Sequence, residues 1–213
     1  MRLRIVGSLI LIIVCDVALA AQTNTSDVPK PPQIPSVVYK LFVEDQEDAK
    51  TIKDEASNSE YLQHVKVREQ TLRTMLAAGQ ITSGDDFLEA AFIFQHGDTG
   101  DDCLFAHILA MDAMARGKAS ARWIAAATLD RYLQSSKQPQ IFGTQYNMDP
   151  ARPVHAAGAR FPFGKTLKPY NDTFLSDSMR TDFCVPTLAQ QEQNVAMFNT
   201  GKWPRETMHP PCP

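Results

Sequence analysis

The sequence predicts a mostly α-helical protein, and the pattern of its residues indicates this fold class in two ways. Apolar residues recur at helical spacing in consecutive stretches, and capping residues stand where helices are expected to begin and end. The short connections favour antiparallel neighbours packed as a helical-hairpin or repeat-like bundle. An extended Gly-Thr-Gln segment and a loop-rich C-terminal region are expected to follow.

Residues 1–20 have the pattern of a secretory signal peptide. Arg2 and Arg4 precede a short apolar run over residues 5–14, and the segment closes on Ala-Leu-Ala at residues 18–20. The run is shorter than the roughly 18 to 20 apolar residues that a spanning helix needs. We therefore expect a secreted or periplasmic protein with no membrane span in the mature chain.

The remaining sequence suits a single domain with one hydrophobic core. Four prolines among polar residues make 21–36 an extended linker, because proline fixes φ and lacks an amide donor. The helical domain is expected over 37–201, and a Pro-rich tail over 202–213.

Two helices are expected before residue 80, over 37–53 and 60–78, with Gly79 closing the second. In the first helix, acidic side chains oppose Lys50 and Lys53, which is typical of a solvated helix surface. The acidic side chains interpreted in this way are Glu44, Asp45, Glu47 and Asp48.

The segments from Ser83 to Gly97 and from Thr99 to Gly117 resemble each other. Each begins with a hydroxyl residue followed three positions later by aspartate, which predicts a helix N-cap and a favourable charge in the first turn. Each ends on a glycine that can adopt the left-handed conformation of a C-cap. The two segments predict short antiparallel helices joined by a tight turn.

A third helix is expected over 120–136, followed by the extended segment 140–148. Residues 150–169 are loop-rich, and "ARFPFGK" within them suggests a small hairpin. A final helix is expected over 185–201, because a proline stands near its start and a glycine at its end.

Removal of the signal peptide leaves Cys103, Cys184 and Cys212. In an oxidising compartment we expect Cys184 to pair with Cys212, which would leave Cys103 as a buried free thiol. In a eukaryotic host the same export route would expose the sequons at Asn24 and Asn171 to glycosylation.

His96 and Asp98 are the candidate catalytic residues, with His96 as general base and Asp98 as the group that orients it. A metal site built from Cys103, His107 and His96 is disfavoured, because the neighbouring aspartates are explained as partners of a helix N-terminus. The sequence contains no GxSxG, HExxH, Walker or GxGxxG motif, and no cofactor is expected.

Asp130, Arg131, Thr144 and Gln145 are the candidate ligand-binding residues. Gly143 would let the backbone approach a ligand closely, while Thr144 and Gln145 offer a hydroxyl and an amide. Asp130 and Arg131 would form a buried ion pair that ties the third helix to this segment. The alternative is that Arg131 and Gln145 only satisfy backbone groups at the junction.

The segments "AAFIFQHGD", "ARWIAAATLDRYL" and "QPQIFGTQY" resemble the signature of an uncharacterised, mainly bacterial domain family. The likeness is specific over 91–146 and loose over the rest of 41–196. It implies one helical domain and points to His96, Asp130, Arg131, Thr144 and Gln145, without naming a reaction.

We expect a binding module of the envelope or secreted space, for an unknown polar ligand or protein partner. A small hydrolase or transferase that uses His96 is the alternative, and an inhibitor or immunity-type partner protein is the third. A net charge of −3 with both signs interspersed gives no reason to expect nucleic acid or an anionic membrane as partner.

Overall fold

The computed structural model describes residues 35–153, 163–204 and 207–208, which belong to one compact unit that begins at Pro35. This unit is mostly helical, as the sequence predicts. Its elements are α1 (Val37–Ala49), α2 (Glu55–Ala77), α3 (Gly84–Phe94), α4 (Gly100–Ala115), a 3-10 turn η1 (Ala119–Ala121), α5 (Arg122–Ser135), β1 (Asn147–Pro153), β2 (Phe163–Thr166), α6 (Asp177–Asp182) and α7 (Leu188–Asn199). The predicted signal peptide and most of the predicted linker lie outside the described residues.

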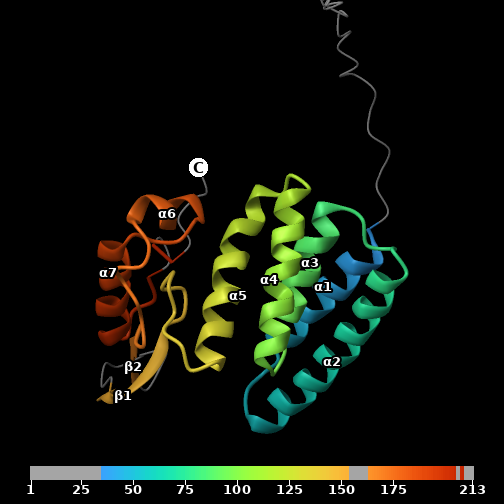
Figure 1. Ribbon diagram of the computed structural model, residues 1–213. Helices are drawn as coiled ribbons and strands as arrows, with labels where there is room; N and C mark the ends of the chain where they lie inside the picture. Colours follow the sequence, from blue (N-terminus) through green and yellow to red (C-terminus); the bar gives the residue numbers. More distant parts are fainter. Residues whose placement is uncertain (1–34, 154–162, 205–206, 209–213) are drawn as a thin grey trace, which may run out of the picture. The chain divides into compact units, whose positions relative to one another are not determined.

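The first five helices pack side by side, with α4 lying between α3 and α5 (Figure 1). Many of the buried positions between these helices are alanines, whose small side chains allow close packing. Those in the main core include Ala90, Ala91, Ala106, Ala110, Ala113 and Ala125. α3 also contacts α1 and α2, so the first two helices cover the far side of α3 from α5. None of the described helices is long and apolar enough to cross a membrane.

The predicted caps of α3 and α4 are confirmed. The hydroxyl of Ser83 accepts from the amide of Asp86, and that of Thr99 accepts from the amide of Asp102. Gly117 has the predicted positive φ, +86°. The prediction for Gly97 is wrong, since its φ is not positive; instead, a Cβ there would lie 2.5 Å from the Cβ of Asp102. A glycine is needed at position 97 because the backbone there lies close to the side chain of Asp102.

Two helix boundaries differ from the prediction because a cap at Asp54 was not anticipated. Asp54 and Ser57 form a capping box, so α2 begins at Glu55 rather than at residue 60. The first helix correspondingly ends at Ala49 rather than at residue 53. Gly79 has a φ of +66° after the end of α2, as predicted.

The C-terminal region packs around a second, smaller core beside α5. β1 and β2 form an antiparallel pair. Most of the segment "ARFPFGK", for which a small hairpin is predicted, lies outside the described residues. The expected last helix is shorter at both ends than 185–201, because Thr187 is its N-cap and Pro186 precedes that cap. The short helix α6 was not predicted.

Candidate functional site: a groove between α1 and α2

His96 is positioned by a carboxylate on α1 and not by Asp98, the neighbour predicted from the sequence. Its Nδ1 lies 2.8 Å from Oδ2 of Asp45 on α1, and its side chain is 22% exposed. Asp98 instead pairs with Lys66, at 2.9 Å, on the surface of α2. The predicted His96–Asp98 pair is therefore replaced by His96–Asp45, because α1 lies against the end of α3 and places its buried carboxylate there.

Asp45 is the centre of a buried polar cluster. Its carboxylate accepts from the hydroxyl of Tyr61 at 3.3 Å, and one of its oxygens lies 3.6 Å from Nη1 of Arg68. Burial, followed by the charge of Asp45, raises the pKa of Tyr61, so the phenol stays protonated. Asp45 is fully buried, which overturns its interpretation as solvated helix surface.

Arg68 connects this cluster to the surface through Asp48. The other side of its guanidinium binds the Asp48 carboxylate, which also lies 3.0 Å from Nδ1 of His64. Hydrogen bonding from Arg68 is the largest of the effects that lower the pKa of Asp48. Asp48 is therefore a carboxylate at neutral pH, held in place by a buried cation below it and an imidazole beside it.

Asp48, His64 and Arg68 line a groove of about 560 Å³ between α1 and α2. We call it the α1–α2 groove, and its lining residues are Leu41, Val43, Glu44, Glu47, Asp48, His64, Val67, Arg68 and Thr71. On α2, the lining positions are three, four and seven residues apart, so they share one helix face. Val67 is 68% exposed and therefore leaves an apolar side chain in water beside the ion pair of Arg68 and Asp48.

A smaller polar hollow of about 140 Å³ continues the groove past His64. It shares Asp48 and His64 with the groove and adds the side chains of Tyr61 and Glu60. The two hollows together place an imidazole and a carboxylate between an apolar trough and a polar one.

Asp130 and Thr144 hydrogen-bond to each other and fasten neighbouring segments of the chain. The buried Asp130 carboxylate accepts from the amides of Ile141, Phe142 and Thr144 and from the hydroxyl of Thr144, at 2.8 to 3.0 Å. These bonds fasten the segment after α5 to that helix.

Arg131 and Gln145 also satisfy backbone groups, as in the alternative raised from the sequence. Arg131 donates to the carbonyl of Gln95 at 3.1 Å, and Gln145 donates to the carbonyl of Ala127 at 3.2 Å. Arg131 therefore does not form the predicted ion pair with Asp130. Gly143 does permit a close approach, but to the amide of Gln191 from α7.

The structure gives no support to a shared cleft lined by His96, Arg131, Thr144 and Gln145. None of the four lines the α1–α2 groove or the other large pocket, of about 340 Å³, beside α7. His107, which was considered as a metal ligand, contacts the carbonyl of Ala125. Among the described residues, no three His, Cys, Asp or Glu side chains are placed to hold a metal ion.

Cys103 is a buried free thiol, as predicted, and burial raises its pKa. Cys184 is buried and disulfide-bonded. Its predicted partner, Cys212, lies outside the described residues, so this pairing stays a prediction.

Comparison with protein-family models, with curated proteins and with solved structures found no match.

Proposed function

We propose that this protein is an exported binding module that takes a segment of a protein partner in the α1–α2 groove. The observation that carries this proposal is an open groove of about 560 Å³ whose apolar wall is left in water, above a fixed ion pair of Arg68 and Asp48. Export is supported by the signal-peptide pattern of residues 1–20.

The exposure of the groove favours a protein segment over a small molecule. Small-molecule sites commonly bury most of the surface of their ligand. Here Val43, Glu44, Glu47, His64 and Val67 are exposed, so a small ligand would keep much of its surface in water. A longer segment that covers the groove would bury these side chains together.

The ion pair beneath the groove would fix the position of the bound segment. Arg68 is held between Asp45 and Asp48, so Asp48 cannot change its place without breaking contacts below it. A preorganised acceptor loses little conformational entropy when a partner binds. The groove thus combines apolar area, which supplies affinity, with a rigid carboxylate, which supplies orientation.

The test is a selection of peptides from a random display library on the purified protein. The selected peptides are expected to bind the wild type and the Met111→Asp variant with the same affinity. Their affinity for the Val67→Asp variant should be at least about tenfold lower, which corresponds to 1.4 kcal/mol. Met111, on α4, is similarly exposed at 54% and provides the matched control. Recovery only of peptides that bind Val67→Asp as well as the wild type would contradict the proposal.

A small hydrolase or transferase is the second candidate, and the contact between His96 and Asp45 favours it. A buried carboxylate that holds a partly exposed imidazole is the arrangement of an oriented general base. Turnover of a panel of activated esters is the test. This candidate predicts a loss of about a hundredfold or more with His96→Asn, and it is wrong if the variant retains the wild-type rate.

A further inference from the structure

We infer that the partner segment is an amphipathic basic helix, whose apolar face packs on Val43 and Val67 and whose lysine or arginine side chains meet Glu44 and Glu47. This inference rests on the proposed function of the α1–α2 groove and specifies the class of its partner.

The first support is that the groove lies between two helices and is lined by side chains. An extended peptide that binds by strand addition needs a sheet edge to satisfy its backbone amides and carbonyls. The lining residues of the α1–α2 groove come only from α1 and α2, whose backbones are hydrogen-bonded within their own helices. An occupant that satisfies its own backbone is a helix.

The second support is the length and spacing of the groove. Its lining runs from Leu41 to Asp48 on α1 and from His64 to Thr71 on α2. Each stretch covers about two helical turns, or roughly 10 Å. A helix would meet this surface with side chains three, four and seven residues apart, which is the usual pattern of helix-in-groove recognition.

The third support is the charge of the groove. Three carboxylates line it, from Glu44, Glu47 and Asp48, against one guanidinium from Arg68. Asp48 is bound by Arg68, and Glu47 pairs with Lys50 in an exposed contact that a partner could replace. Glu44 forms no ion pair within the part of the chain that the structure describes. The surplus is negative, so the complementary partner is basic.

The polar hollow beyond His64 extends this preference in the same direction. Glu60 lies there, exposed and without an ion pair among the described side chains. A basic residue one or two turns beyond the apolar anchors of the bound helix would reach it. Glu44 and Glu60 are therefore expected to meet different basic side chains of the same partner.

The experiment uses two synthetic 14-residue helical peptides with identical leucine positions, in which the polar positions are all lysine or all glutamate. Binding of each fluorescein-labelled peptide is measured by anisotropy. The lysine peptide is expected to bind the wild type, and the glutamate peptide to bind at least about tenfold more weakly. Glu44→Lys combined with Glu47→Lys should reverse this preference.

Two controls separate groove binding from general charge. Asp182→Lys combined with Glu192→Lys changes the net charge equally but on α6 and α7, and should leave the preference of the wild type intact. A lysine peptide with a central proline keeps its charge but loses its helix, and is expected to bind at least tenfold more weakly. Equal effects of the two double variants, or equal binding of the proline peptide, would overturn the inference.

The failure of this inference is distinguishable from failure of the proposed function. Library peptides that depend on Val67 but carry no basic residues would overturn the basic helix and leave the groove as a binding site. Peptides with no dependence on Val67 would remove both. Dependence on Val67 together with a reversed charge preference in the Glu44→Lys/Glu47→Lys variant is the result expected.

Discussion

Oδ2 of Asp45 lies 2.8 Å from Nδ1 of His96, although 51 residues separate them in the sequence. This contact links α1 to the turn between α3 and α4, and it places a buried carboxylate behind the α1–α2 groove. The same carboxylate contacts Arg68, which binds Asp48 in the groove wall. A connected set of charged side chains therefore supports the wall of the groove, and the geometry of this wall depends on Asp45.

Replacing Asp45 with alanine should destabilise the protein by about 3 kcal/mol, because it leaves the buried Arg68 cation without one of its carboxylates. Chemical denaturation measures this loss. Glu47→Ala is the matched control on the same helix, since its pair with Lys50 is exposed, and should change stability by less than about 0.5 kcal/mol. If Asp45→Ala lowered the stability as little as Glu47→Ala does, the buried cluster would contribute nothing measurable to folding.

Replacing Asp130 with alanine should release the segment after α5. Four donors would lose their acceptor, three of them backbone amides, and we expect a loss of about 3 kcal/mol. Hydrogen exchange gives the local evidence: the amides of Ile141, Phe142 and Thr144 should exchange faster, while those in α3 keep their protection. Uniform acceleration in α3 as well would argue against a local fastener.

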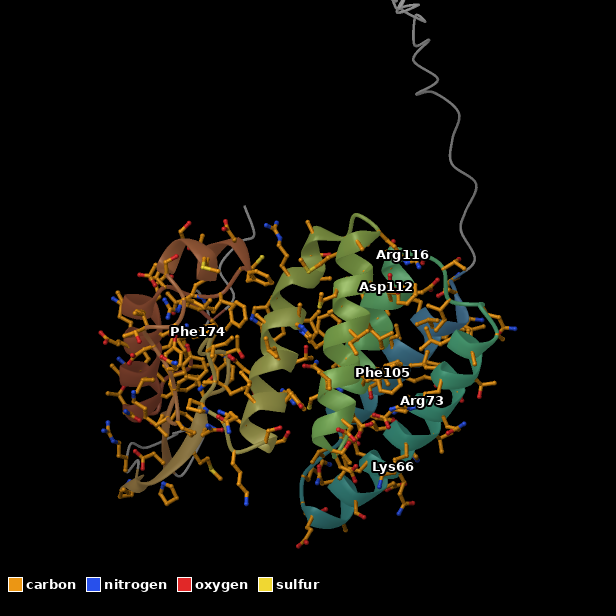
Figure 2. The ribbon with its side chains drawn as sticks, in the orientation of Figure 1. Lys66, Arg73, Phe105, Asp112, Arg116 and Phe174 are labelled. Carbon is orange, nitrogen blue, oxygen red and sulfur yellow. The ribbon has the colours of Figure 1, made fainter. Side chains whose placement is uncertain are left out.

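Glu69 should make stability depend on pH near neutrality. Lys66 and Arg73, which flank it on α2 (Figure 2), pair with Asp98 and Asp102, and Glu69 is left buried with one oxygen lacking a hydrogen-bond donor among the described residues. Burial, and then the charge of Asp102, raise its pKa from 4.5 to about 7. The folded protein thus binds a proton more tightly than the unfolded chain does.

This contribution to stability is complete below about pH 4.5 and is lost as pH rises towards 7. A Glu69→Gln variant lacks that loss, so its stability relative to the wild type should rise by on the order of 3 kcal/mol between pH 4.5 and pH 8. Unfolding free energies of both proteins at the two pH values measure it. A difference that does not change with pH would show that Glu69 titrates normally in the folded protein.

Replacing Gly97 with alanine should cost about 1 to 3 kcal/mol, because the new Cβ would crowd Glu69 and Asp102, at 2.6 and 2.5 Å. Gly79→Ala is the comparison: nothing lies within 4 Å, and only its φ of +66° is unfavourable. Adding Glu69→Ala should recover part of the loss at Gly97 and none of the loss at Gly79. Additive effects at both sites would contradict the crowding.

The sequence predicts local features well because their causes are local. The caps at Ser83 and Thr99 depend only on residues three positions apart, and both are confirmed. Asp54 supplies the same kind of signal and shows that an N-cap can be missed when no apolar periodicity follows it at once. The extended segment after α5 was also expected from its Gly-Thr-Gln sequence.

The candidate site depends on contacts that no local pattern shows. Asp45 stands in an acidic run that is typical of helix surface, yet it is buried by α2 and by the turn after α3. One signal was present: Asp45 is three and four residues from Phe42 and Leu41, on the apolar side of its helix. The roles of Thr144 and Gln145 could not be separated from ligand binding, because the same hydrogen-bonding groups serve a ligand or the backbone.

The measurement that tests the central claim most directly is the affinity of one library-selected peptide for three proteins: the wild type, Val67→Asp and Met111→Asp. Both substituted valine and methionine side chains are exposed, so both variants are expected to fold. If the α1–α2 groove is the binding site, Val67→Asp weakens binding by at least about tenfold and Met111→Asp leaves it unchanged. Equal affinities for all three proteins would contradict the account.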